Sequence, residues 1–349
     1  MPYKVLIVDD SHFFQQRLKQ IIDEHPDLKV VGVAANGQQA IDMDAELKPD
    51  IISMDYEMPQ VDGVTAVRTI LARRKVPIVM FSSMTYEGAA ITLQALEAGA
   101  VDFIPKNFAE VSRDSTILKN RLHEKLITFA RASKPKPQLS IHPRVDSRPP
   151  PIKSASQKFA AGEIKLVAIG ASTGGPVALT DIIARLPENF PIPVVIAQHM
   201  PENFTKVFAE RLNRQSKLYV KEAESGEKLE VGKVLIIPGG MQLLFDRGGQ
   251  SVRIIAGDER VNYKPSVDIM FASAANIFGS KVLGIVLTGM GADGCEGARL
   301  IKQNGGKIWA QDEGSSVIYG MPAAVASAGL TDAILAIEDF PAEMSARFC

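Results

Sequence analysis

Short apolar runs typical of buried strands alternate with segments of helical periodicity along most of this chain. The expected strands cover residues 5–8, 30–33, 51–54, 78–81, 101–104, 166–169, 193–198 and 282–287. In the first half, helical patterns fall at residues 13–23, 38–47, 64–73, 88–98 and 115–129. Strands and helices that alternate in this way build βαβ units, whose strands lie parallel. The sequence therefore predicts an α/β protein with doubly wound parallel sheets.

A proline-rich basic segment, residues 126–162, separates the two α/β regions. Its central part, residues 131–160, holds six prolines and seven Lys or Arg against one acidic residue. Proline interrupts helices and central strands, and the polar remainder buries too little apolar surface to order itself. We expect a tether between a five-stranded domain at 1–125 and a larger Rossmann-like domain at 163–349. A solvated tether is favoured over a basic docking patch.

Composition excludes several classes of protein. The 39 basic and 40 acidic residues leave no basic footprint for nucleic acid. Two cysteines, Cys295 and Cys349, provide neither a disulfide framework nor a cysteine-based zinc site. The N-terminal apolar run is too short and too acidic for a signal peptide, and no run approaches the roughly 20 apolar residues of a membrane span. We expect a cytoplasmic monomer that neither binds nucleic acid nor inserts into membranes.

Polar residues collect at strand ends in the first domain. Asp9 and Asp10 follow the first strand, Asp55 the third and Lys106 the fifth, while Ser82 closes the fourth. Three carboxylates in one pocket repel each other unless a cation lies between them, and such hard oxygen ligands suit Mg²⁺. A lysine and a hydroxyl beside them suit a phosphoryl group, which a carboxylate can accept covalently. Taken singly, these residues fit a helix cap or a solvated lysine; together they favour a phosphoryl-transfer site.

Residues 3 to about 125 resemble the response-regulator receiver family. The residues that carry the resemblance are Val8–Ser11, Asp55–Gly63, Phe81–Ser83 and Phe103–Lys106. The resemblance implies that a histidine kinase phosphorylates Asp55. It also implies Mg²⁺ bound by Asp10, Asp55 and the backbone carbonyl of Glu57, with Asp9 behind these ligands or acting as another.

The same resemblance assigns the remaining receiver residues. Ser82 and Lys106 would bind the phosphoryl oxygens, and Phe103 would be the aromatic residue that responds to phosphorylation. One position departs from the family, because Asn107 stands where receivers commonly have proline after the lysine. We expect the loop after Lys106 to differ and the chemistry to be retained.

Three expected strands of the second domain each lead into a residue type of a hydrolytic triad. One leads into the Gly-x-Ser-x-Gly turn around Ser172, the next into His199, and the third through a glycine-rich turn into Asp293. His199 is the only histidine after residue 142. In open parallel sheets ligands bind beyond the carboxyl ends of the strands. A strand, sharp turn and helix around Ser172 match a nucleophile elbow, whose N–H groups can face an oxyanion.

These motifs leave alternatives open. The turn at Ser172 could instead bind a dinucleotide phosphate, but the G-x-G-x-x-G pattern is absent and a nucleophile is favoured. His199 could be a core histidine, and Asp293 could belong to an ordinary Asp-Gly turn. Asp312, at another strand end, competes with Asp293 as the residue that orients the histidine. The triad order differs from that of α/β-hydrolases, so a different fold is expected.

Residues 163 to about 345 resemble the catalytic domain of the CheB family, the chemotaxis protein-glutamate methylesterases. The segments that carry the resemblance are Gly170–Pro176, Ala197–Pro201, Pro265–Asp268, Leu287–Gly294 and Tyr319–Pro322. The resemblance implies a Ser172–His199–Asp293 triad, favouring Asp293 over Asp312. It further implies hydrolysis of glutamyl methyl esters on chemoreceptors and deamidation of glutamines. Residues 239–242 and 262–264 lack an expected histidine, which we interpret as a change in substrate contacts.

Together these patterns predict a serine hydrolase that phosphorylation activates. Backbone N–H groups at Thr173 and Met290 are expected to hold the oxyanion. Mg²⁺ would serve only receiver phosphorylation, and the hydrolase site would need no cofactor. A receiver-controlled scaffold, whose second domain binds a partner or nucleotide without hydrolysis, is the alternative.

Overall fold

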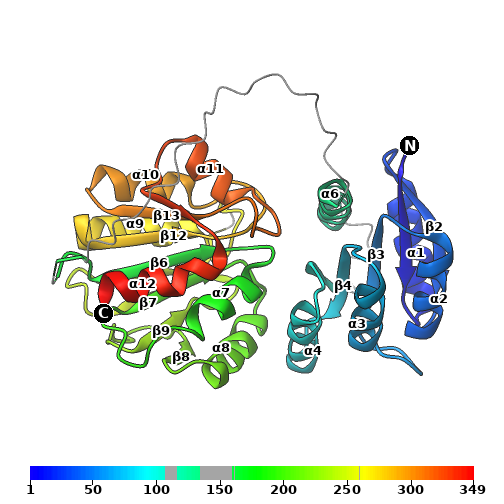
Figure 1. Cartoon of the computed structure of the whole chain (residues 1–349), viewed down its shortest axis with the longest axis horizontal. Coiled ribbons are helices and arrows are strands. Elements are labelled where there is room, and N and C mark those ends of the chain that lie inside the picture. The colour runs from blue at the N-terminus through cyan, green and yellow to red at the C-terminus, as the bar shows by residue number, and fades with distance from the viewer. Residues whose placement is uncertain (107–115, 134–158, 161, 259) are drawn as a thin grey trace. The chain divides into compact units, whose positions relative to one another are not determined.

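The computed structural model describes residues 1–106, 116–133, 159–160, 162–258 and 260–349. The chain divides into two compact units, Met1–Ser140 and Ile141–Cys349, which are described separately (Figure 1). Asn107 and most of the expected tether lie outside the described residues.

The N-terminal unit is built on five parallel strands. They are β1 (Tyr3–Val8), β2 (Leu28–Ala34), β3 (Ile51–Asp55), β4 (Ile78–Ser83) and β5 (Asp102–Lys106). The helices are α1 (His12–Asp23), α2 (Gly37–Leu47), α3 (Gly63–Arg73), α4 (Tyr86–Glu97) and α6 (Thr116–Ala132). The sheet order is β2-β1-β3-β4-β5, and α1 packs on α6 while α3 packs on α2 and α4. The predicted five-stranded doubly wound sheet is confirmed, and α6 runs past residue 125 into the expected tether.

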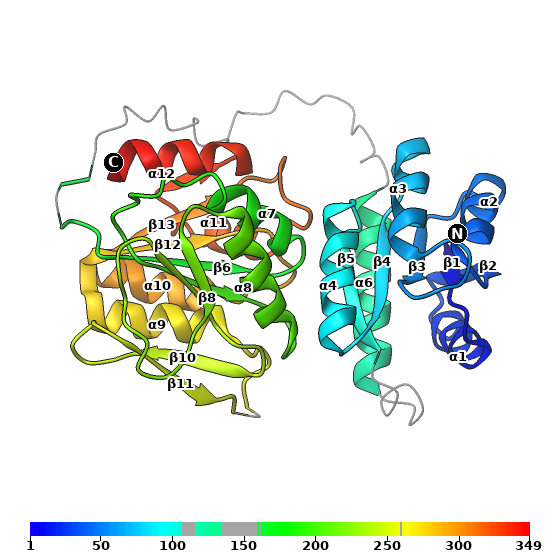
Figure 2. The same cartoon turned by 90° about the horizontal axis from the view of Figure 1, so that it is seen from below.

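The C-terminal unit contains a seven-stranded parallel sheet of order β14-β13-β12-β6-β7-β9-β8. Its strands are β6 (Leu166–Ala171), β7 (Val194–Gln198), β8 (Tyr219–Glu222), β9 (Lys233–Ile236), β12 (Val282–Val286), β13 (Lys307–Gln311) and β14 (Ala333–Leu335). Two further strands, β10 (Met241–Phe245) and β11 (Val252–Ala256), form an antiparallel hairpin that contacts α9 and stands apart from the main sheet (Figure 2). The larger parallel-sheet domain is therefore confirmed, with this hairpin added.

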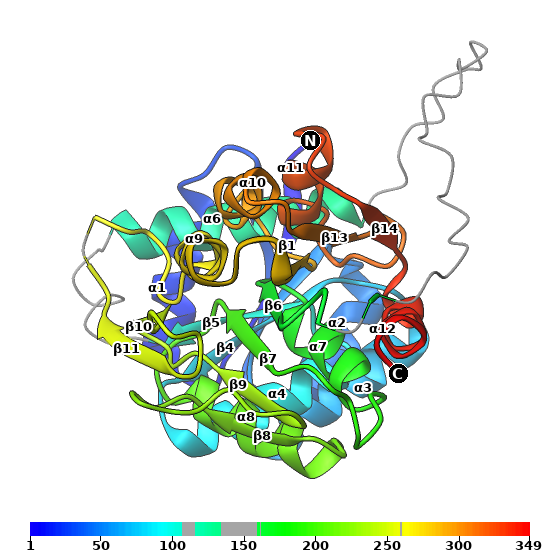
Figure 3. The same ribbon diagram turned by 90° about the vertical axis from the view of Figure 1, so that its left-hand side faces the viewer.

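Helices cover both faces of the seven-stranded sheet. They are α7 (Gly175–Ile183), α8 (Phe204–Gln215), α9 (Val267–Phe278), α10 (Cys295–Gln303), α11 (Met321–Ser327) and α12 (Phe340–Phe348), with short 3-10 turns at Gly279–Lys281 and Ile337–Asp339. Helices α9 and α10 lie on one face, and α7 and α8 lie on the other (Figures 1 and 3). No helix within the described ranges is long and apolar enough to cross a membrane.

Strand β6 lies at the point where the strand order reverses. The chain continues from β6 to β7 on one side and later returns to place β12 on the other. All residues of β6, β7 and β12 are buried, as expected for central strands covered on both faces. Ligands of open α/β sheets bind at such a reversal, beyond the carboxyl ends of the strands. The fold therefore predicts a ligand-binding site at the loops that follow these three strands.

The contact between β6 and α9 leaves no room for a side chain at Gly170. A Cβ atom there would lie 2.3 Å from Val267 Cγ1. We expect Gly170→Ala to lower the free energy of unfolding by about 1–3 kcal/mol, because the overpacked helix must move. Denaturant unfolding can be followed through Trp309, the one tryptophan of the chain, which lies buried in β13.

Gly248→Ala is the matched control, since a Cβ at Gly248 meets no atom within 4 Å. Equal unfolding midpoints for the two variants would contradict this account of the packing between β6 and α9.

Candidate active site and candidate metal centre

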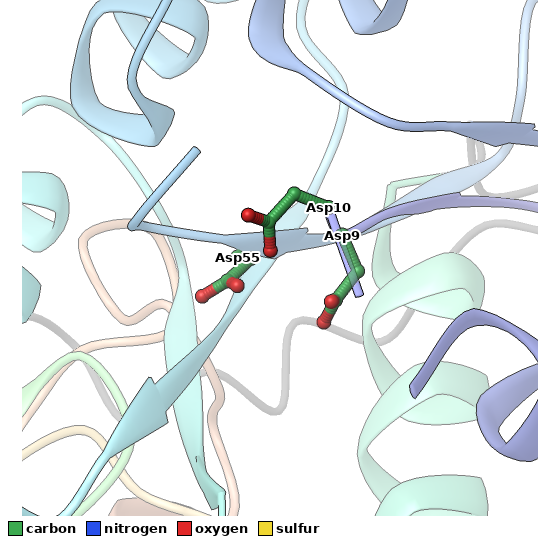
Figure 4. A group of neighbouring side chains, drawn as sticks. All are labelled: Asp9, Asp10 and Asp55. Carbon is green, nitrogen blue, oxygen red and sulfur yellow. The ribbon is translucent and has the colours of Figure 1, made fainter. Parts of the chain in front are cut away.

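The acidic residues of the N-terminal unit meet where β1 and β3 end (Figure 4). Asp9 and Asp10 follow β1, and Asp55 is the last residue of β3. Carboxylate oxygens of the three residues lie within 4.8 Å of one another. Asp9 and Asp55 are buried while Asp10 is exposed. The parallel sheet therefore brings together the three carboxylates that the sequence suggested.

Lys106, at the end of β5, places its ammonium group among these acids. Its Nζ atom lies 2.6 Å from Asp55 Oδ2 and 2.7 Å from Asp9 Oδ2, and 4.5 Å from the centre of the Phe14 ring. Burial raises the pKa of Asp55 to about 6, although Lys106 opposes the shift. Burial also raises the pKa of Asp9. One lysine thus compensates only part of the negative charge in the cluster.

The cluster has the chemistry of a magnesium site. Asp9 Oδ2 is buried, and the Lys106 ammonium that lies 2.7 Å from it is shared with Asp55. Carboxylate oxygens are ligands that Mg²⁺ prefers, together with waters and phosphate oxygens. Glu57, whose backbone carbonyl is the other implied ligand, lies two residues after Asp55 and has an exposed side chain. The residues present therefore fit the metal.

Ser82, one of the last two residues of β4, and Phe103, in β5, are both buried. The Ser82 hydroxyl lies 2.5 Å from Thr92 Oγ1 and donates to the carbonyl of Gly88 at 3.3 Å. Both partners belong to α4, so the hydroxyl is engaged by that helix in this structure. Ser82 thus lies near the end of β4, and its hydroxyl contacts α4 in this structure.

A chain of hydroxyl groups beside the cluster was missed by sequence reasoning. The Tyr56 hydroxyl lies 2.8 Å from Ser83 Oγ, which lies 2.9 Å from Thr85 Oγ1. Thr85 caps the start of α4 by accepting from the N–H of Gly88. The chain links the residue after Asp55 to α4, and the only sequence signal was the position of these hydroxyls after strands β3 and β4.

Ser172 of the C-terminal unit lies on the sharp turn between β6 and α7. Gly174 has a φ of +77° at the helix N-cap, a conformation that glycine adopts without steric cost. The Ser172 N–H donates to the carbonyl of Thr288 at 3.0 Å, and its own carbonyl accepts from the N–H of Gly175 at 2.8 Å. These bonds fix a turn that leaves Ser172 half-buried. The strand, turn and helix match the expected elbow.

His199 follows β7 directly beside this turn. Ala171 and Gln198 are partners in the sheet register, and the His199 N–H donates to the carbonyl of Ala171 at 3.0 Å. Ser172 and His199 therefore begin neighbouring loops on strands about 4.8 Å apart. Gln198 Nε2 donates to the carbonyls of Ser172 at 2.9 Å and His199 at 3.2 Å. One buried amide thus ties the backbones of both residues together.

Asp293 binds the imidazole of His199. The distance from His199 Nε2 to Asp293 Oδ2 is 2.7 Å. Burial alone would raise the pKa of Asp293, but the hydrogen bond and charge of His199, with the N–H groups of Asp268 and Val267, lower it. His199 Nδ1 is buried and has no protein partner among the described residues. An ionised carboxylate thus occupies one side of the ring, and the other nitrogen is available as a base.

Of the two acidic residues that could orient His199, Asp312 makes local contacts instead. Asp312 Oδ1 accepts from the backbone N–H of Ser315 at 2.9 Å and from its hydroxyl at 2.6 Å. These bonds close a local turn after β13. Asp293, and not Asp312, contacts His199.

Thr173 and Met290, the expected oxyanion donors, lie on turns that meet at Ser172. The Thr288 hydroxyl donates to the carbonyl of Thr173 at 2.9 Å, which joins the turn after β6 to the turn after β12. A Cβ at Gly289 would lie 2.7 Å from Ser172 Cβ, so only glycine allows this approach. The backbone that leads into Met290 therefore passes directly beside the serine.

Tyr263 and Gln242 lie in the two segments, residues 262–264 and 239–242, that lack an expected histidine. The Tyr263 ring stacks on His199, with ring centres 4.3 Å apart and planes 7° from parallel. Gln242 Nε2 donates to the carbonyl of Tyr263 at 2.7 Å, and its Oε1 accepts from the N–H of Ser266 at 2.8 Å. An aromatic ring stacked on the imidazole restricts its orientation. These residues thus support the base.

Comparison with known proteins supports both halves of this description. Residues 167–344 match the CheB methylesterase family, and residues 5–115 match the response regulator receiver domain. A protein-glutamate methylesterase/protein-glutamine glutaminase of Saccharophagus degradans is 62% identical, with 97% of each chain covered. A protein of the same name from Pseudomonas aeruginosa is 49% identical, also with 97% of each chain covered.

A solved structure agrees with the C-terminal unit. The crystal structure of the Thermotoga maritima CheB methylesterase catalytic domain is 43% identical, with a TM-score of 0.50. The match covers 52% of this chain and 97% of that domain. The chain therefore belongs to the CheB methylesterase family and carries an N-terminal response regulator receiver domain.

Proposed function

We propose that this protein hydrolyses glutamate methyl esters and deamidates glutamines on chemoreceptors, and that phosphorylation of Asp55 activates it. The observation that carries the proposal is the geometry of His199. Its Nε2 binds the ionised Asp293 at 2.7 Å, and it directly follows β7, the strand next to the one that leads into Ser172. The names of the relatives supply the substrate class.

In the proposed reaction, Ser172 Oγ attacks the γ-carbonyl carbon of the modified side chain. His199 Nδ1 takes the hydroxyl proton, and Asp293 stabilises the resulting imidazolium. The N–H groups of Thr173 and Met290 hold the oxyanion of the tetrahedral intermediate. When this intermediate collapses, the proton passes from His199 to the leaving group, which departs as methanol or ammonia. Water, activated by His199, then hydrolyses the glutamyl ester of Ser172, which frees the serine hydroxyl and leaves a glutamate side chain on the receptor.

In the receiver, Asp55 accepts a phosphoryl group from a histidine kinase. Asp10, Asp55 and the carbonyl of Glu57 would hold Mg²⁺, with Asp9 beside them. The bound ion would neutralise charge on the phosphoryl oxygens and the carboxylates. Lys106 already lies 2.6 Å from Asp55 Oδ2 and supplies a second positive charge.

Phosphorylation would act on the residues that connect the cluster to α4. The Ser82 hydroxyl would leave its contacts with Thr92 and Gly88 to reach a phosphoryl oxygen, and Phe103 would repack in response. A change of about 1.4 kcal/mol in the free-energy difference between the active and inactive forms alters their ratio tenfold.

The first test of the hydrolase is kinetic. Ser172→Ala and His199→Ala should each lower kcat for methyl-ester hydrolysis by about 10⁴-fold or more, because each removes half of the nucleophile–base pair. Asp293→Asn should retain more activity than either, since Asp293 transfers no proton. Asp312→Asn is the matched control and should stay close to the wild type. Greater damage from Asp312→Asn than from Asp293→Asn would refute the triad assignment.

The second test concerns the acidic cluster. Acetyl phosphate should add one phosphoryl group to the full chain in the presence of Mg²⁺ and none in the presence of EDTA, as read by intact-protein mass spectrometry. Asp55→Asn should abolish the addition. Asp62→Asn is the control, because Asp62 caps α3 and asparagine caps a helix equally well. Phosphate found on the Asp55→Asn variant would eliminate Asp55 as the sole acceptor.

A further inference from the structure

The first turns of α9 and α10 each receive hydrogen bonds from an acidic residue at the start of the other helix: Asp268 lies in α9, and Asp293 lies just before α10. The first turn of a helix leaves backbone N–H groups without intrahelical partners, and these usually need side-chain acceptors. Gly294, the N-cap of α10, has no side chain to supply one. The missing acceptor comes from Asp268, the second residue of α9.

Asp268 Oδ1 accepts from two N–H groups of α10. The distances are 2.9 Å to Gly294 N and 2.7 Å to Gly297 N. In the opposite direction, Asp293 Oδ2 accepts from Val267 N at 2.8 Å, and Asp293 Oδ1 accepts from Asp268 N at 3.0 Å. Each carboxylate therefore accepts from the start of the helix beside which the other lies, and we call these four hydrogen bonds the reciprocal cap.

The position of Asp293 depends on these contacts. It lies between Gly291 and Gly294, whose φ angles are +85° and +97°, so its own loop offers little steric restriction. Besides His199, the donors to its carboxylate within the described part of the chain all come from residues 266–268: Ser266 Oγ at 3.0 Å and the two N–H groups of the reciprocal cap. What fixes residues 266–268 against α10 therefore also fixes Asp293.

Close packing makes this arrangement sensitive to small shifts. A Cβ at Gly297 would lie 2.5 Å from Phe271 Cβ and 2.9 Å from the carbonyl of Asp268, so α9 and α10 approach closely at this level. Burial, together with the neighbouring charge of Asp293, raises the pKa of Asp268 to about 6. The N-terminal ends of the two helices favour negative charge and hold both carboxylates in place.

We propose that Asp268 is a positioning residue, whose bonds to Gly294 and Gly297 set Asp293, and through it His199, for the hydrolysis. The effect on activity rests on the proposed function. Asp268 touches neither the imidazole nor the reacting atoms in this arrangement; it acts only through the reciprocal cap.

Variants of Asp268 in the full chain give the kinetic test. Asp268→Ala should lower kcat about 10- to 100-fold, as a displacement of about 1 Å in a catalytic group does, with KM within about twofold. Asp268→Asn should stay within roughly threefold of the wild type, because its amide oxygen can accept from both N–H groups. Asp268→Glu retains the charge but displaces the carboxylate, so it should also lower kcat. Trp309 fluorescence shows whether each variant is folded.

Asp332→Ala is the matched control. Asp332 Oδ2 accepts from Ile308 N at 2.7 Å and Oδ1 from Lys302 Nζ at 2.6 Å, so it ties a loop to the amino end of β13, at the opposite end of the sheet from Ser172. Its loss should lower stability and leave kcat unchanged. A loss of kcat with Asp268→Ala no larger than with Asp332→Ala would overturn the proposal.

A double variant tests whether Asp268 acts through Asp293 or by another route. If Asp268 acts through Asp293, adding Asp268→Ala there should change kcat by less than about twofold, because interacting sites are non-additive. A full further loss of 10- to 100-fold in that background would show that Asp268 acts by another route.

Crystal structures of Asp268→Ala and Asp268→Asn supply a readout that does not depend on hydrolysis. The distance between His199 Nε2 and Asp293 Oδ2, 2.7 Å here, should exceed hydrogen-bonding range in the alanine variant and be retained in the asparagine variant. An unmoved Asp293 in the alanine variant would refute the positioning role even if the wild type hydrolysed no ester. A wild type without esterase activity but with the displaced Asp293 would instead reject the proposed function alone.

Discussion

The chemistry of this protein depends on one constraint, the burial of parallel strands on both faces. Residues of β6, β7 and β12 are buried along their whole length, so reactive side chains can enter only where these strands end. Ser172, His199 and the turn to Asp293 occupy those ends. In the N-terminal unit the ends of β1 and β3 hold Asp9, Asp10 and Asp55 in the same way.

The two sites use buried carboxylates in opposite ways. In the receiver, burial raises the pKa of Asp55 to about 6, and Lys106 compensates only part of the charge. That excess of negative charge suits a cation and then a phosphoryl group. Asp293 instead receives hydrogen bonds from His199 and from the N–H groups of Val267 and Asp268, which lower its pKa and keep it ionised. A carboxylate that stays ionised can support an imidazolium.

The sequence predicted what local patterns determine. Apolar runs and helical periodicity identify the five receiver strands, and the residues at strand ends identify both clusters. The roles of Tyr263, Gln242 and Asp268 could not be predicted, because each contact joins segments far apart in the chain: Tyr263 stacks on His199, and Asp268 caps α10. The engagement of the Ser82 hydroxyl by α4 likewise follows from packing, and not from any pattern in the sequence.

The most direct test of the hydrolytic site is covalent trapping of the nucleophile. A fluorophosphonate probe should label the full chain on Ser172 alone, as mapped by peptide mass spectrometry. Its rate should rise when acetyl phosphate and Mg²⁺ phosphorylate Asp55, and fall sharply in the His199→Ala variant. Labelling of a different serine, or none under either condition, would contradict the account and favour a receiver-controlled scaffold that binds without hydrolysis.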